Sequence, residues 1–398
     1  MINFSNAMTD QNHALVFGAA GLLGWAAVDQ LLSDYPAPQT FSQVTAVVNR
    51  PVAEAALHWP AASTTRPKLH IASGINLLDG DADALARQLG EKAPGIENVT
   101  HAFYFVFSPV NDDHMEECRV NCGMMQCVAD TLNLLCPQLK SIVYAGGTRG
   151  YGIYNPGGTF TAPLVESMAD TLPEDYAKTV TYPWFRQILT RASRGRSWTW
   201  TEVCPDAVVG FSPNGSAFSL ALHWAQYLAL YRLNNEASGD VQVPFPGSEA
   251  GFDALFTPVS SQTLGRISVH AALHPGECGG KIVNMADRAR PTTFRELWPC
   301  IAGWFGLVGV GPEADATALK PGKYVEKHKH LFATRGLTDA VEKGVGAGSV
   351  QLDSVGWWLA FDRQLSLERL RATGFDEERD PVEGWLEAFG KFRAAGII

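Results

Sequence analysis

Three glycines near the N-terminus follow a short apolar run. The run His13–Phe17 leads into Gly18, and Gly21 and Gly24 follow before an apolar pattern at helical spacing. This order predicts a strand, a tight turn and a helix. In such a turn the backbone can approach a pyrophosphate, whose charge meets free N–H groups and the positive end of the helix dipole. A plain turn that uses glycine for positive φ is the alternative. The residues expected at the phosphates are Gly18, Gly21, Leu22, Leu23 and Gly24.

Apolar runs and helical patterns alternate along the following part of the chain. Further strands are expected at 44–48, 69–71, 101–107, 140–144 and 198–204, and helices at 81–89, 113–135 and 185–192. Strands that are buried on both faces and alternate with helices form a parallel sheet that is covered on two sides. The sequence therefore predicts an α/β fold with a Rossmann-type, doubly wound parallel sheet.

In the second half of the chain, the alternation of strands and helices is replaced by a mostly helical pattern. We expect a dispensable tail at 1–12, an NAD(P)-binding Rossmann domain at 13–212, and a smaller, mostly helical substrate-capping region at 213–398. Helices are expected at 218–233, 260–273, 294–305 and 365–373, with a turn at 243–247 and a strand at 281–284. This prediction also allows strands near 241–284 that rejoin the sheet.

Composition limits the classes of partner. Lys and Arg number 31 against 41 Asp and Glu, and this net charge of −10 would repel a nucleic acid unless basic groups gathered on one face. No stretch approaches the roughly 18 uninterrupted apolar residues of a membrane span, and the first residues are polar. We therefore expect a small-molecule substrate, a cytoplasmic location, and neither a nucleic-acid nor a membrane partner. Whether the protein forms a homodimer is left open.

Cysteine and histidine give no metal-binding signal. The seven cysteines lack the paired spacing of a zinc or redox site, and we interpret them as buried thiols. His328 and His330 are interpreted as part of a solvated helical face rather than as ligands. No metal is predicted.

The end of the second strand bears on the choice of nucleotide. An NAD site usually has a carboxylate there for the ribose hydroxyls, but this chain has Asn49 and Arg50. Their donors suit a 2′-phosphate, so NADP(H) is favoured, with NAD(H) and a merely solvated arginine as alternatives. Asn76, with Leu77, follows the third strand, where an adenine contact or a plain turn is expected.

Several blocks in order along the chain resemble a known family. They are Val99–Phe105, Asn121, Trp198–Pro205, Val209–Pro213, Phe245–Gly247, Thr293–Pro299, Trp304–Leu307 and Gly384–Trp385. Together with the glycine spacing, they resemble the extended short-chain dehydrogenase/reductase superfamily, which includes NAD-dependent epimerases and dehydratases. Within that superfamily the blocks are most similar to the progesterone 5β-reductase/iridoid synthase family. Phe105, in the first block, is included among the expected cofactor contacts.

The resemblance implies a tyrosine proton donor supported by a lysine that lowers its pKa and holds the nicotinamide ribose. Matching the tyrosine block onto residues 179–187 gives Tyr182 as the candidate, which would also contact the cofactor. A core tyrosine at a helix start is the alternative. The lysine position falls on Arg149 or, with a one-residue shift, on Thr148, and Arg186 lies four residues after Tyr182. An arginine keeps the charge but is not interchangeable with lysine, so this substitution puts redox activity in question.

Aromatic residues indicate the substrate class. Tyr151, Tyr154, Phe211, Trp357 and Trp358 are candidates for an apolar substrate wall, although most aromatic residues simply form core. Such a wall suits a hydrophobic carbonyl compound better than a sugar nucleotide. We expect an NADP(H)-dependent reductase of an activated C=C or C=O bond. The alternatives are an NAD-dependent epimerase or dehydratase, and a catalytically inactive dinucleotide-sensing protein.

Overall fold

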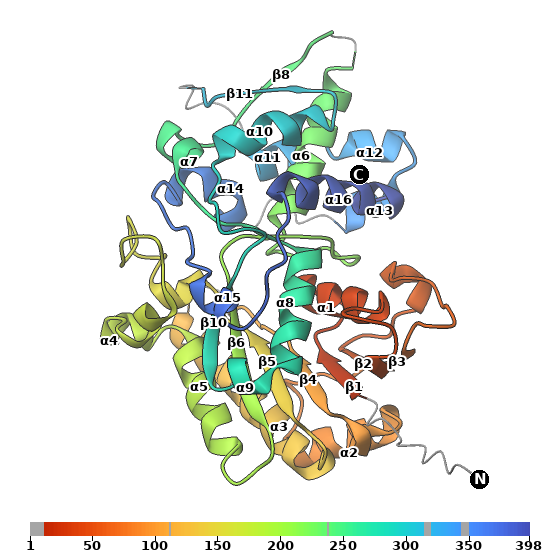
Figure 1. Cartoon of the computed structure of the whole chain (residues 1–398). Coiled ribbons are helices and arrows are strands. Elements are labelled where there is room, and N and C mark those ends of the chain that lie inside the picture. The colour runs from red at the N-terminus through yellow and green to blue at the C-terminus, as the bar shows by residue number, and fades with distance from the viewer. Residues whose placement is uncertain (1–11, 111–112, 237–238, 314–319, 344–349) are drawn as a thin grey trace, which may run out of the picture.

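The computed structural model describes residues 12–110, 113–236, 239–313, 320–343 and 350–398. Figure 1 shows a sheet with its helices in the lower half and a group of helices above it. The sheet has the strand order β10-β6-β5-β4-β1-β2-β3. Its strands are β1 (Asn12–Phe17), β2 (Phe41–Val48), β3 (Lys68–Ser73), β4 (His101–Tyr104), β5 (Ser141–Ala145), β6 (Thr199–Pro205) and β10 (Lys281–Met285). All neighbouring pairs are parallel, which confirms the predicted Rossmann-type sheet.

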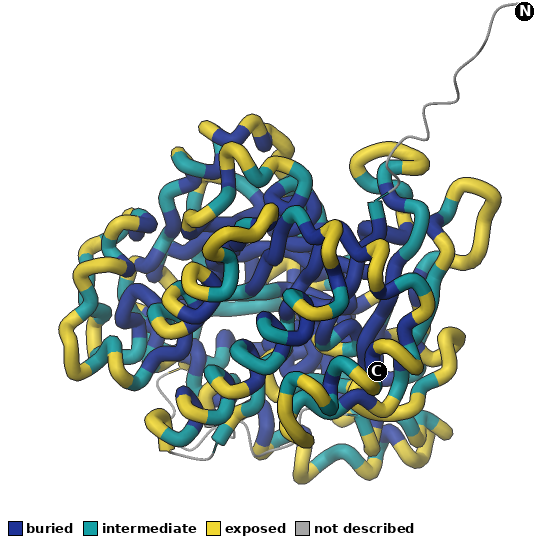
Figure 2. Tube along the Cα trace, turned by 90° about the horizontal axis from the view of Figure 1, so that it is seen from below, coloured by how far each residue is buried: buried dark blue, intermediate teal, exposed yellow. Residues whose placement is uncertain are grey.

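The sheet is buried on both faces because its strands alternate between two cores. In β1, Ala14 and Val16 belong to one hydrophobic cluster, and Leu15 and Phe17 belong to the other. The first cluster is covered by α1 (Leu22–Leu32) and α8 (Ser261–Leu273); the second by α2 (Ala82–Lys92), α3 (His114–Leu135) and α5 (Thr181–Ala192). Figure 2 shows the strands as a buried centre with exposed residues mainly around it.

The upper layer consists mainly of helices from the second half of the chain (Figure 1). They are α6 (Leu220–Asn234), α7 (Glu249–Asp253), α10 (Phe294–Gly303), α11 (Pro321–His328), α12 (His330–Thr334), α13 (Thr338–Glu342), α14 (Val350–Trp358) and α16 (Pro381–Ala394). Two short parallel pairs accompany them: β8 (Gln242–Pro244) with β11 (Val308–Val310), and β7 (Val208–Val209) with β9 (Val259–Ser260). The remaining short helices are α4 (Glu174–Ala177), α9 (Pro275–Cys278) and α15 (Glu368–Ala372).

Trp224 on α6 lies at the centre of this layer. Its ring stacks on Trp385 of α16 at a centroid distance of 5.3 Å. It also meets the edges of Trp298 and Phe294, both on α10, at 5.3 and 5.1 Å. The three tryptophans are fully buried, so α6, α10 and α16 share one aromatic core.

The second half of the chain contributes to both layers. After α6, the chain returns to the sheet as α8 and β10, and the strand expected at 281–284 pairs with β6. The turn expected at 243–247 starts inside β8, a three-residue strand too short to show an alternating pattern. The helix α16 was not predicted. The expected tail at 1–12 lies outside the described residues except for Asn12, which begins β1.

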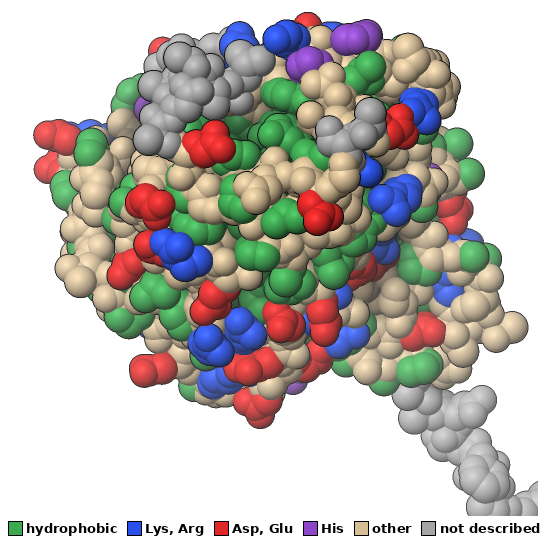
Figure 3. All heavy atoms as spheres, turned by 90° about the horizontal axis from the view of Figure 1, so that it is seen from above, with side chains coloured by type: hydrophobic (Ala, Val, Ile, Leu, Met, Phe, Trp, Pro, Cys, Tyr) green, Lys and Arg blue, Asp and Glu red, His purple; other side chains and the backbone are tan. Residues whose placement is uncertain are grey.

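The surface of the helical layer carries charges of both signs. In Figure 3, which views the molecule from above, acidic and basic side chains are interspersed across this face. Ion pairs account for part of the mixture, since Arg295 contacts both Asp253 and Glu249. Within the described part of the chain, no helix combines the length and apolar character needed to cross a bilayer.

Candidate active site

The glycine-rich turn follows β1 at the carboxyl edge of the sheet. Gly18 has φ +74°, and a Cβ there would lie 2.5 Å from the carbonyl oxygen of Phe105. A Cβ at Gly24 would lie 2.1 Å from the carbonyl oxygen of Gly18. Only glycine therefore fits at these two positions, because the turn passes directly against its own helix and against the chain after β4. Phe105, which directly follows β4, thus borders the turn through its backbone.

The N-terminus of α1 has free backbone donors. Gly21 is its N-cap residue, is exposed, and provides no side-chain hydrogen bond, and the first turn has no acidic residue. By contrast, Asp81 caps α2 and Asp113 caps α3 through their carboxylates. The amides of Leu22 and Leu23 at the start of α1 can therefore donate hydrogen bonds to an anionic ligand. This geometry fits the diphosphate of a dinucleotide.

The other expected nucleotide contacts lie along the same edge of the sheet. Asn49 and Arg50 follow β2 and are both exposed, and the Arg50 side chain has no hydrogen-bond or ion-pair partner among the described residues. The side chain of Asn76 accepts a hydrogen bond from the Leu78 amide at 3.2 Å, which is a turn contact. Leu77 is half-buried and packs beside the second core. Arg50 is thus free to meet a ligand, whereas Asn76 already stabilises its own loop.

Tyr182 lies in the first turn of α5 and packs against the turn that follows β5. A Cβ at Gly147 would lie 3.2 Å from the Tyr182 hydroxyl, and one at Gly150 would lie 3.1 Å from its ring. The two glycines thus make room for the phenol. Burial raises the pKa of Tyr182 above its ordinary value, and the positive charge of Arg149 opposes this shift.

Arg149 lies in the 3-10 turn η3 (Thr148–Tyr151) and is held on several sides. Its Nη1 lies 2.6 Å from Oε1 of Glu117, and its Nη2 donates to the carbonyl oxygen of Thr179 at 2.7 Å. The guanidinium lies over the ring of Tyr154, 5.1 Å from its centroid. Arg149 therefore brings a fixed positive charge to the vicinity of Tyr182.

The chain matches, over residues 14–398, the family described as PRISE-like Rossmann-fold domain. It belongs to that family. The short chain dehydrogenase sirQ of Leptosphaeria maculans is 30% identical over 397 residues, covering 97% of each protein. The (S)-8-oxocitronellyl enol synthase ISY2 of Nepeta cataria is 25% identical over 97% of this chain and 91% of the relative. These matches confirm the resemblance to extended short-chain dehydrogenases/reductases, and the chain is an oxidoreductase of that type.

Solved structures of other proteins share this Rossmann-type fold at low sequence identity. The GDP-mannoheptose C4 reductase of Campylobacter jejuni, solved with NADP, has a TM-score of 0.61 and 11% identity over 97% of this chain and 99% of that chain. The Bordetella bronchiseptica enzyme WbmG, solved with NAD, has a TM-score of 0.59 and 14% identity over 98% of this chain and 97% of that chain. Both nicotinamide dinucleotides thus occur in proteins of this fold.

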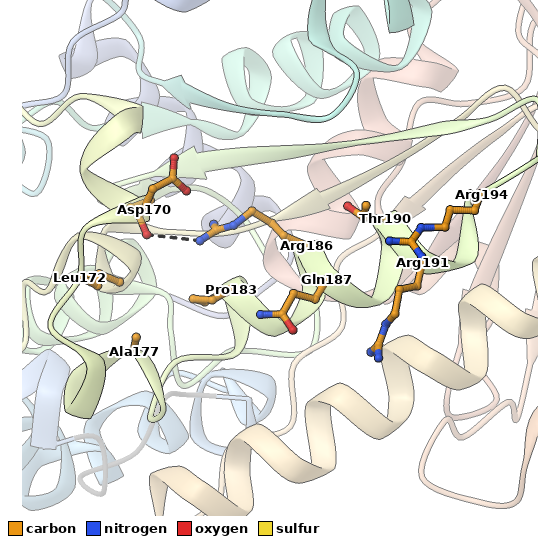
Figure 4. Close-up of a pocket in the computed structure, with 10 residues that line it drawn as sticks. Asp170, Leu172, Ala177, Pro183, Arg186, Gln187, Thr190, Arg191 and Arg194 are labelled. Carbon is orange, nitrogen blue, oxygen red and sulfur yellow. Dashed lines mark hydrogen bonds between the residues drawn. The ribbon is translucent and has the colours of Figure 1, made fainter.

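Arg186, the other candidate cation of this PRISE-like chain, is engaged elsewhere. Its Nη1 lies 2.8 Å from Oε2 of Glu202, which also accepts a hydrogen bond from the Tyr144 hydroxyl at 2.8 Å. A pocket of about 540 Å³ lies between α5 and the segment from Ala169 to Ala177. Figure 4 shows Arg186 among the side chains that line it. The positive charge of Arg186 opposes the rise in the pKa of Tyr144 that burial and Glu202 cause. The two candidate arginines therefore have different surroundings: Arg149 lies in the turn beside Tyr182, and Arg186 lies at Glu202 with Tyr144.

The expected substrate wall is split between core and surface. Phe211 is 1% exposed and packs in the core against Trp25 and Phe392, so it has no free face for a ligand. Tyr151 is also 1% exposed, and its hydroxyl donates to Asn284 at 2.6 Å. These two residues belong to the core, because Phe211 packs between α1 and α16 and Tyr151 is bonded to β10.

The other aromatic candidates of this family member are accessible. Tyr154 is half-buried and meets the edge of Trp358 at 5.5 Å. Trp357 is 40% exposed, with the Lys320 ammonium 5.1 Å from the centre of its ring. Because Tyr154 also lies under the Arg149 guanidinium, it connects the accessible aromatic residues with the turn beside Tyr182.

Sequence reasoning missed several residues that fix the site. Thr148 donates to Oδ1 of Asp206 at 2.9 Å, and Oδ2 of Asp206 lies 3.0 Å from Nε of the buried Arg363. The sequence indicates Asn121 only through the family resemblance, not its contacts. Its side chain accepts a hydrogen bond from the Ser108 amide and donates one to the Ser108 carbonyl. Glu117, on the same helix, had no signal in the sequence. Only a family alignment could have singled out such residues.

No metal-binding arrangement is found in the described ranges, where no three His, Cys, Asp or Glu side chains converge. His328 packs on the Tyr324 ring at 4.3 Å, and His330 is exposed. These contacts are those of a helical surface.

Proposed function

We propose that this chain is an NADP(H)-dependent reductase of an activated C=C or C=O bond in a small hydrophobic carbonyl compound. One observation carries the proposal: the Tyr182 hydroxyl lies against Gly147 at the end of β5. The uncapped start of α1 follows β1 at the same edge of the parallel sheet. A proton donor and an anion-binding turn at one sheet edge match the needs of hydride transfer to a carbonyl compound.

The residues present fit a nicotinamide dinucleotide. The backbone at Gly18 and the amides of Leu22 and Leu23 would hold the diphosphate, with Phe105 beside them. When bound, the reduced dinucleotide would supply the hydride. Arg50 supports the preference for NADP(H), since it is exposed just after β2, where Asn49 and Arg50 stand in place of a carboxylate.

Tyr182 would supply the proton or hydrogen bond at the substrate oxygen. Burial raises the pKa of its phenol, so the hydroxyl keeps its proton at neutral pH and can donate. Arg149 opposes the shift and stabilises negative charge that develops on the oxygen. We assign Arg186 no part in this step, because its guanidinium contacts the Glu202 oxygen that accepts from the Tyr144 hydroxyl.

The accessible aromatic side chains support a hydrophobic substrate. Tyr154 and Trp358 form an edge-to-face pair close to the turn that carries Arg149, and Trp357 is exposed next to them in the chain. One relative is named for an 8-oxocitronellyl compound. The proposal extends this class, a carbonyl compound with a hydrocarbon body, to the present chain.

The test is NADPH oxidation by the purified protein with a panel of enones and aldehydes. Tyr182→Phe removes only the hydroxyl, so turnover should fall by roughly 10²–10⁴-fold while the NADPH-induced rise in melting temperature stays. Tyr231→Phe, in α6, is the control and should behave as the wild type. Equal rates for Tyr182→Phe and the wild type would remove Tyr182 from the mechanism.

A dinucleotide-binding protein without turnover is the second candidate. It is favoured by the engagement of both terminal nitrogens of Arg149, with Glu117 and with the Thr179 carbonyl. An arginine held in this way is less available to the nicotinamide ribose than a lysine would be. NADPH binding without oxidation by any compound of the panel would support this candidate against the reductase.

A further inference from the structure

The ion pair between Glu117 and Arg149 joins α3 to the turn beside Tyr182. The carboxylate and guanidinium lie 2.6 Å apart, and the two side chains are only 7% and 13% exposed. Glu117 also lies 3.5 Å from the amide of Val110, in the loop after β4. The pair is therefore a shielded contact between three segments of the site, unlike the exposed ion pairs on the helix surfaces.

Arg149 has little freedom to turn. One terminal nitrogen contacts Glu117 and the other donates to the Thr179 carbonyl, three residues before Tyr182. The Tyr154 ring lies below the guanidinium plane at 5.1 Å. The position of the charge relative to the phenol is thus set by these partners, and among the described residues that contact Arg149 the anion is Glu117.

The phenol itself lies among few charges. The groups that face it are Arg149 and Tyr154 from the turn and loop after β5, Glu202 and Cys204 from β6, and, beyond Arg149, Glu117 and Cys118 from α3. Arg149 is the cation among them that favours the phenolate. A carboxylate 2.6 Å from that cation offsets part of its charge, because opposite charges at this distance cancel much of each other's field.

We propose that Glu117 is a positioning residue for Tyr182: it fixes the Arg149 guanidinium and offsets its charge, so that the phenol stays protonated and donates. The inference rests on the proposed function, since it assumes that Tyr182 is the donor. It gives Glu117 an effect on the titration of Tyr182 that a merely structural salt bridge would not have.

The test uses Glu117→Gln. Glutamine has the shape of glutamate, and its amide oxygen can still accept a hydrogen bond from Arg149, so position is kept while the negative charge is lost. The matched control is Glu116→Gln, because Glu116 pairs with Arg119 on the exposed side of the same helix. Phenolate absorbance is followed against pH, and the curve of the same protein carrying Tyr182→Phe is subtracted to isolate Tyr182.

We expect Tyr182 to begin to ionise at a pH about one unit lower in Glu117→Gln than in the wild type, because the charge of Arg149 is then no longer offset. Glu116→Gln should match the wild type. Ionisation curves of Tyr182 that do not differ between Glu117→Gln and the wild type would overturn the inference. Binding of NADPH, seen as a rise in melting temperature, confirms that each variant is folded.

Glu117→Asp covers the case in which Glu117→Gln does not fold. Aspartate keeps the charge, so the buried arginine stays compensated, but its shorter side chain withdraws the carboxylate from Arg149. We expect a smaller shift in the same direction, and a wild-type ionisation curve would again overturn the inference. The absorbance measurement needs no substrate, so the two proposals fail independently. A shift in Tyr182 ionisation without NADPH oxidation counts only against the proposed function. NADPH oxidation without such a shift counts only against the role of Glu117.

Discussion

The Tyr182 hydroxyl lies over the backbone of Gly147, where an added Cβ would be 3.2 Å from the phenolic oxygen. Gly147 has an extended backbone, with φ 166°, so alanine would fit without strain and would act only by displacing the phenol. We expect Gly147→Ala to lower kcat/KM for an enone by about tenfold or more, because small misplacements of a donor are costly. NADPH binding should not change.

Gly123→Ala is the control for that substitution. Gly123 lies in α3 with no neighbour within 4 Å of an added Cβ, so its replacement adds the same methyl group without displacing anything. If Gly147→Ala turned over substrate as fast as Gly123→Ala, the contact between Gly147 and Tyr182 would have no catalytic importance.

Arg50 should decide between the two nucleotides. Its exposed side chain is free to contact a 2′-phosphate, and a hydrogen bond to a charged group contributes about 1.5–3 kcal/mol. We expect Arg50→Ala to raise the Kd for NADPH by about tenfold or more and to leave the Kd for NADH unchanged. Calorimetric titration measures both constants, with Arg87→Ala on the exposed side of α2 as the control. Equal weakening of both nucleotides would contradict the preference for NADP(H).

Arg186 should affect stability. Arg186→Ala leaves Glu202 buried without its cation, so the free energy of unfolding should fall by about 3–5 kcal/mol, as measured with urea. The double variant Arg186→Met with Glu202→Gln removes both charges and should recover much of that loss. NADPH oxidation by the folded double variant should remain close to that of the wild type. A complete loss of turnover in this folded variant would instead make Arg186 the supporting cation.

The sequence predicted those parts of the protein that depend on local patterns. The turn at Gly18 and the apolar strands follow from spacing and periodicity, and both describe how neighbouring residues fold. The contacts of Tyr182 with Gly147 and of Arg149 with Glu117 each join residues more than 30 positions apart, and no local pattern encodes them. The burial of Phe211 was missed for the same reason, because its partners come from distant helices.

His101 makes the stability of the protein depend on pH. It is 3% exposed on β4, and burial lowers its pKa to about 4. In the unfolded chain its pKa is about 6.5. Between about pH 4 and pH 6.5, the unfolded chain therefore binds a proton at His101 that the folded protein does not bind. The contribution of neutral His101 is complete above pH ~6.5 and is lost at about 1.4 kcal/mol per pH unit as the pH falls toward 4. His101→Gln should therefore flatten the fall in unfolding free energy between pH 7 and pH 5, measured with urea, whereas His330→Gln, on the surface, should not. An equal slope in the two variants would contradict the low pKa of His101.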